Sequence, residues 1–109
     1  GVYIGGTALG IAEGAVNTYL EQARSRISRA SGKAVSDFPT QQVKIAEALS
    51  CIEAARLLIY GACDQMTEIL ESGRLPSDEE RARCRAEATF AGQLATRAVN
   101  VVWDAAGGG

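Results

Sequence analysis

Residues 77–106, SDEERARCRAEATFAGQLATRAVNVVWDAA, carry the strongest structural signal in this sequence of 109 residues. Ser77 stands three residues before Glu80, which is the pattern of a capping box at the start of a helix. Beyond it, small residues recur in alternating steps of four and three, the period of one helix face. These positions are Cys84, Ala88, Ala91, Ala95, Ala98, Val102 and Ala105. The stretch predicts a helix over about 78–106 whose small seam lets neighbouring helices approach closely.

A second helix is predicted over about 40–72. Apolar residues from Ile45 to Leu70 follow the helical period, and Gly73 is suited to end the helix. Additional alanines widen the apolar stripe beyond one face, and such a helix is usually buried on more than one side. Two neighbouring helices cannot cover it, so we expect a further helix or another subunit to do so.

A first helix is predicted over about 2–31, because its apolar residues follow the same period and Gly32 can terminate it. It contains a glycine at every fourth position, namely Gly6, Gly10 and Gly14. Each glycine inside a helix costs about 1 kcal/mol relative to alanine. We interpret this glycine stripe as a site of tight helix packing.

The three helices with short connections predict an all-α fold, an antiparallel up-down bundle formed by one domain over residues 1–109. The chain does not begin with methionine, and it ends on three glycines directly after a predicted helix. We therefore expect a segment of a longer protein. The missing fourth wall of the bundle would come from a helix after Gly109 or from neighbouring subunits.

Composition excludes several classes of function. The net charge of −2 gives no general attraction to nucleic acid or to an anionic membrane surface. No apolar run approaches the ~20 residues that span a bilayer. The chain has no histidine, which excludes a serine–histidine triad within it, a histidine–zinc site and the Glu-x-x-His pattern of di-iron bundles. We expect neither catalytic residues nor a metal site in this chain.

The three cysteines, Cys51, Cys63 and Cys84, all fall within helical patterns and form no Cys-x-x-Cys pair. We interpret them as small buried hydrophobic residues of a protein in the reducing cytoplasm.

Positive charges gather at the end of the first helix. The residues are Arg24, Arg26, Arg29 and Lys33. Two interpretations stay open. The cluster is a solvated helix end, where cations suit the negative end of the helix dipole, or it is a phosphate clamp, since guanidinium groups bind phosphate oxygens in pairs.

Other charged residues predict structural contacts. Glu53 and Arg56 can pair because they lie three residues apart on a helix. Arg97 lies among small apolar residues, so we expect it to meet a carboxylate or an interface. The partner of Glu13 is left open.

Three stretches together resemble the C-terminal helical domain of the acyl-CoA dehydrogenase superfamily. They are ALGIAEGAVNTYLEQARSR (residues 8–26), FPTQQVKIAEALSCIEAARLLIYGACD (38–64) and RAVNVVWDAAGGG (97–109). Their order and spacing carry the resemblance, with IEAARLL (52–58) as its most telling piece.

The sequence departs from the dehydrogenase pattern in three places. Ser28 and Ser31 replace the arginine and phenylalanine of Arg-x-x-Phe-Gly, and Phe38 is followed by proline instead of glutamine. The segment 104–108, DAAGG, replaces Gln-x-x-Gly-Gly. In these respects the chain looks more like the branch of reduced-flavin-dependent monooxygenases, which hydroxylate aromatic or polycyclic substrates.

The resemblance implies an oligomerisation and flavin-binding domain that is inactive alone. It implies a homotetramer, a four-helix C-terminal bundle, reduced FMN or FAD as cofactor, a separate flavin reductase and a small-molecule substrate. It places several residues of this chain near the flavin. They are Arg24, Arg26, Arg29, Gln41, Gly107 and Gly108. An acyl-CoA dehydrogenase proper is the alternative enzyme, and a free helical self-association module is the alternative without enzymatic activity.

Overall fold

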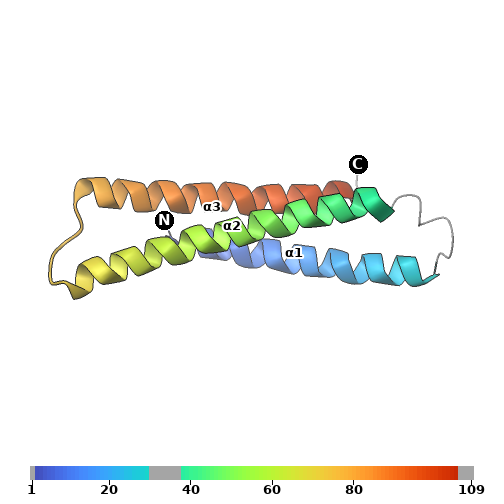
Figure 1. Ribbon diagram of the computed structural model, residues 1–109, viewed down its shortest axis with the longest axis horizontal. Coiled ribbons are helices and arrows are strands. Elements are labelled where there is room, and N and C mark those ends of the chain that lie inside the picture. Colours follow the sequence, from blue (N-terminus) through green and yellow to red (C-terminus); the bar gives the residue numbers. More distant parts are fainter. Residues whose placement is uncertain (1, 30–37, 106–109) are drawn as a thin grey trace.

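The computed structural model describes the backbone of residues 2–29 and 38–105, and the side chains of residues 6–22 and 40–105. It contains three long helices and, within these ranges, no strand. Helix α1 spans Val2–Arg29, α2 spans Phe38–Glu71 and α3 spans Asp78–Ala105. They form an elongated array of 62 × 22 × 19 Å (Figure 1). The prediction of an all-α fold is confirmed.

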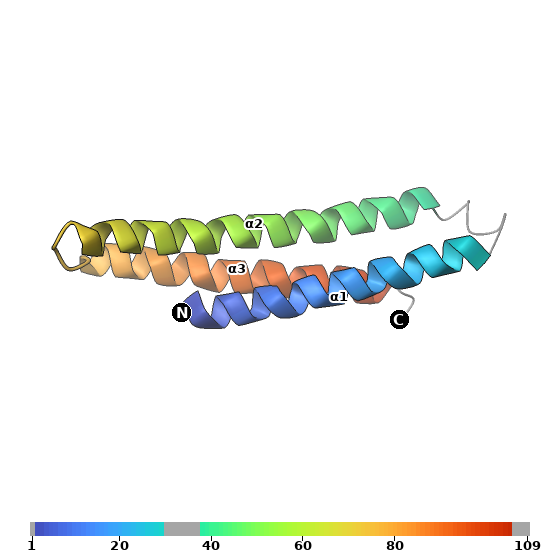
Figure 2. The same cartoon turned by 90° about the horizontal axis from the view of Figure 1, so that it is seen from below.

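Helices α2 and α3 form an antiparallel hairpin and share the most extensive contact of the molecule. Helix α1 runs antiparallel to α2 and packs more extensively against α3 than against α2. It begins partway along the hairpin and runs beyond the end of α3 (Figure 2). The hairpin tip is therefore a two-helix structure, whereas three helices meet in the middle of the molecule.

The core forms around the small seam predicted on α3. Ala91, Ala95 and Ala98 are at most 1% exposed, so α1 and α2 both lie close against this helix. Among the described side chains, the buried residues of α1 are Leu9, Ala12, Val16 and Tyr19, and those of α2 include Ala48, Ile52, Ala55 and Ile59. The sequence prediction for the seam is confirmed.

The connection between α2 and α3 has the local chemistry that its sequence predicts. The Glu80 N–H donates to Ser77 Oγ at 3.1 Å, and the Ser77 N–H donates to Glu80 Oε1 at 2.9 Å, which completes the capping box. Gly73 has a φ of 86°, in the left-handed region that favours glycine after a helix end.

The interpretation of the glycine stripe is wrong within this chain. Gly6, Gly10 and Gly14 are exposed, and a Cβ atom added at any of them would meet no other atom within 4 Å, apart from the helix's own nearby backbone. The glycines lie on a different face of α1 from its buried residues, and Ile11 beside them is also exposed. No other helix of the described structure packs on that face.

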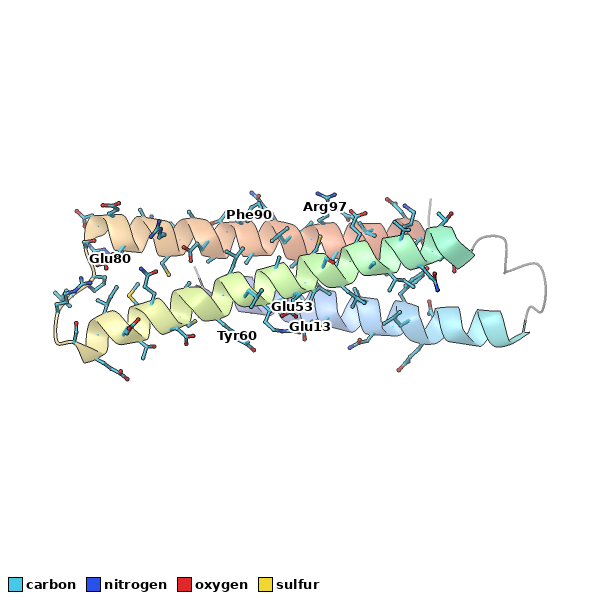
Figure 3. The ribbon with its side chains drawn as sticks, viewed as in Figure 1. Glu13, Glu53, Tyr60, Glu80, Phe90 and Arg97 are labelled. Atoms are coloured by element: carbon cyan, nitrogen blue, oxygen red, sulfur yellow. The ribbon has the colours of Figure 1, made fainter. Side chains whose placement is uncertain are left out.

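Helix α2 retains uncovered apolar surface, as expected for a helix with so wide an apolar stripe. Val43, Leu57 and Tyr60 are 68%, 64% and 59% exposed. In Figure 3, Tyr60 projects on the opposite side of the bundle from Phe90 of α3. Three helices leave α2 with an open apolar face.

The prediction for the cysteines is only partly correct, because Cys51 is buried and Cys84 is half-buried, but Cys63 is exposed. Across the described residues, no group of three or more cysteine, aspartate or glutamate side chains could hold a metal ion. Within the same part of the chain, no helix is long and apolar enough to cross a bilayer.

We predict that Ala95→Leu and Ala98→Leu each destabilise the fold by about 1–3 kcal/mol, because the closely packed seam has no room for a larger side chain. Thermal or denaturant unfolding measures the change. Ala86→Leu is the matched control on the exposed face of α3 and is expected to have little effect. Equal effects of all three substitutions would contradict close packing at the seam.

Candidate functional site

The predicted phosphate clamp lies on the last two turns of α1. The helix continues through Arg29, so Arg26 and Arg29 occupy neighbouring turns of one helix face, while Arg24 falls on another face. The side chains of residues 23–39 lie outside the described residues, and so does Lys33 entirely. Their contact with a phosphate therefore stays a prediction.

The fold brings the helix ends that carry the predicted flavin-contacting residues to one end of the molecule. The end of α1, the start of α2 and the end of α3 all point in that direction (Figure 2). Gln41, in the first turns of α2, is half-buried there. Gly107 and Gly108 follow α3 but lie outside the described residues.

Arg56 lies at the centre of a charged network between α1 and α2. Its Nη2 donates to Glu13 Oε1 at 2.5 Å, and its Nη1 donates to Glu53 Oε2 at 2.7 Å. The hydrogen bond to Glu13, ahead of the attraction to Glu53, raises the pKa of Arg56. The predicted Glu53–Arg56 pair is confirmed. The Glu13–Arg56 pair, which joins residues 43 positions apart, could not be read from sequence spacing.

A groove of about 410 Å³ lies beside this network, and the sequence pattern does not predict it. Its lining residues are Glu13, Val16, Asn17, Leu49, Ser50, Ile52, Glu53 and Arg56. The residues come from both α1 and α2, and only the packing of the two helices brings them together. No spacing within either helix could have indicated the groove.

Arg97 binds a carboxylate, which is one of the two environments predicted for it. Its Nη2 lies 3.0 Å from Glu47 Oε2, and its Nε donates to the same oxygen at 3.1 Å. The pair connects α3 to α2 at the surface of the bundle. Its guanidinium is thus engaged in a contact between helices.

A third arginine pair lies at the hairpin tip, away from the end that carries the arginine cluster. Arg74 donates through Nη1 and Nη2 to the two carboxylate oxygens of Glu80 at 2.7 and 2.8 Å. These hydrogen bonds, helped by the Ser77 N–H, lower the pKa of Glu80 from 4.5 to about 2. The pair supports the capping box and does not belong to the predicted flavin site.

A family model described as the acyl-CoA dehydrogenase C-terminal domain matches residues 2–109, nearly the whole chain. No curated protein and no solved structure matches it significantly.

We predict that Glu80 makes fold stability depend on pH between about 4.5 and 2. Its pKa is lower in the folded protein than the ordinary 4.5, so its stabilisation is complete above pH 4.5 and is lost as the pH falls towards 2. Glu80→Gln removes the stabilisation that the Glu80 carboxylate contributes. The difference in the free energy of unfolding between the parent protein and this variant should therefore shrink as the pH falls. Urea unfolding at several pH values measures that difference.

Glu79→Gln is the matched control, because it removes the adjacent exposed carboxylate and leaves the Arg74–Glu80 pair intact. The Glu80 contribution would be ruled out if the difference in the free energy of unfolding between Glu80→Gln and the parent protein stayed constant from pH 5 to pH 2.

Proposed function

The chain belongs to the acyl-CoA dehydrogenase C-terminal domain family, and we propose that it is the flavin-binding and self-association domain of a reduced-flavin-dependent monooxygenase. The proposed substrate is an aromatic or polycyclic small molecule. When bound, reduced flavin supplies two electrons for O₂ cleavage, so that one oxygen atom enters the substrate and the other leaves as water. The flavin is reduced FMN or FAD delivered by a separate reductase.

The observation that carries the choice of branch is the substitution at the end of α1. Ser28 and Ser31 stand where the dehydrogenase pattern has arginine and phenylalanine before glycine. The Phe38-Pro39 start of α2 and the segment 104–108 depart from the same pattern. These differences argue against FAD binding by this chain in the manner of a dehydrogenase.

The described helix supports a phosphate contact at Arg26 and Arg29. Their positions are three residues apart, about 4.5 Å along the axis, a spacing at which two guanidinium groups can bind one phosphate. The C-terminal end of a helix repels anions, so the side chains themselves must supply the attraction. Arg56, Arg74 and Arg97 are each held by carboxylates, which makes them poor alternatives.

Self-association is the second part of the proposal, with a homotetramer as the proposed assembly. The open apolar face of α2, with Val43, Leu57 and Tyr60 largely exposed, supports it. A helix following Gly109 could also cover part of this face. A non-enzymatic helical self-association module would use the same surface without any flavin.

An acyl-CoA dehydrogenase proper is the second candidate, favoured by the name of the family that matches the chain. We expect the full-length protein to consume O₂ and hydroxylate an aromatic substrate when supplied with a flavin reductase and NADH. A dehydrogenase would instead retain FAD through purification and pass electrons from an acyl-CoA to an artificial acceptor. Activity in the second assay alone would overturn the monooxygenase proposal.

We predict that Arg26→Ala and Arg29→Ala, made in the full-length protein, each weaken reduced-flavin binding about tenfold or more. The loss corresponds to a charged hydrogen bond of ~1.5–3 kcal/mol. Anaerobic fluorescence titration measures the affinity, while substrate affinity and melting temperature should change little. Arg85→Ala, an exposed arginine on α3, is the control. If all three variants bind flavin like the parent protein, the cluster is a solvated helix end.

A further inference from the structure

The contact between α1 and α2 combines apolar packing with one directional link. The buried residues among the described side chains of α1 are Leu9, Ala12, Val16 and Tyr19, and the hydrophobic attraction between such residues is non-directional. Among the described side chains, Glu13–Arg56 is the ion pair that joins α1 to another helix. Its two side chains are 38% and 35% exposed, so they lie at the edge of the packed interface.

Arg56 is oriented towards α1 by its own helix. Glu53, one turn earlier on α2, binds Nη1 at 2.7 Å, and this contact leaves Nη2 directed at Glu13. Figure 3 shows Glu13 and Glu53 close together where α1 and α2 cross. The guanidinium is rigid and planar, so a contact at both nitrogens defines a direction as well as a distance.

Within one turn in either direction, the observed register of α1 is the one that provides an acidic partner at this point. Sliding α1 by one turn, about 5.4 Å, would bring residues near Leu9 or Asn17 opposite Arg56. Neither position is acidic, so a shifted α1 would leave Arg56 without its partner on that helix. Polar contacts at helix interfaces are best attested in this role of specifying register.

The register matters most at the end of α1. The last turns of this helix run beyond the end of α3, so packing against α3 cannot fix them directly (Figure 2). Their place follows from how α1 packs against α3 and crosses α2 further back. These turns carry Arg26 and Arg29.

We propose that Arg56 is a positioning residue, which fixes the register of α1 through Glu13 and thereby places Arg26 and Arg29 for the flavin phosphate. The link to the phosphate rests on the function proposed above, whereas the role in register does not.

The test measures helix position and flavin binding separately in the full-length protein. Spin labels at exposed Gln22 of α1 and Gln42 of α2, in a background lacking Cys51, Cys63 and Cys84, report the distance between the helices. Labelled chains are diluted with unlabelled ones, so that each assembly contains one label pair. Reduced-flavin affinity is titrated on the unlabelled variants.

Glu13→Ala and Glu53→Ala form a matched pair, because each removes one carboxylate from Arg56 but only the first cuts the link to α1. We expect Glu13→Ala to broaden the distance distribution or shift it by up to about 5 Å, one helical turn. Flavin affinity should fall several-fold with it. Glu53→Ala should leave the mean distance in place.

An unchanged distance distribution in Glu13→Ala overturns the positioning role, whatever happens to flavin binding. A changed distribution with unchanged flavin affinity supports the role in register and overturns its link to the phosphate. That result differs from a failure of the proposed function, in which Arg26→Ala and Arg29→Ala themselves leave flavin binding unaffected.

The reversed pair, Glu13→Arg with Arg56→Glu, covers the case in which Glu13→Ala does not fold. It restores opposite charges across the same two positions. We expect the parent distance distribution to return relative to Glu13→Arg alone, in which two cations face each other. A reversed pair that behaves like Glu13→Arg alone overturns the proposal.

Discussion

Close approach of three backbones at the alanine seam of α3 is the constraint on which this structure depends. Ala91, Ala95 and Ala98 are almost completely buried, yet each contributes little apolar area. The seam stabilises the fold because small side chains let long helices make many short-range contacts. Because the stability of such a bundle depends on the fit between its helices, a smaller side chain in the seam destabilises it, and a larger one destabilises it more.

Most of the fold could be predicted because its signals are local. The capping box at Ser77 and Glu80, the stop at Gly73 and the periodic seam of α3 each act within a few residues. The choice of the buried face of α1 could not be predicted in the same way. The glycine stripe and the set of Leu9, Ala12, Val16 and Tyr19 both follow the helical period. Because the large apolar residue Ile11 also lies on the exposed side, periodicity did not separate the two faces.

Among the charged residues, too, the contact within one helix was predictable and the contacts between helices were not. Glu53–Arg56 is a neighbour pair on one helix and was predictable, but Glu13–Arg56 and Arg97–Glu47 join helices whose register the sequence does not specify. Of the predicted flavin-contacting residues, the arginines were chosen by charge and family resemblance. The structure shows that the last turns of their helix, α1, lie at the end of the molecule where α2 begins. The groove beside Arg56 required the packed structure, because its lining comes from two helices.

The partial overlap of α1 with the hairpin makes local stability uneven along the molecule. Near the tip, only α2 and α3 face each other, and Leu70 and Leu75 are largely exposed. Opening of that end therefore breaks fewer buried contacts than opening of the middle, and its backbone amides should exchange with solvent through local fraying. The capping box and the Arg74–Glu80 pair are located at this same end. Polar contacts there hold together a region in which hydrophobic burial is thin, so the hairpin tip and the middle of the bundle differ in the kind of force that keeps them folded.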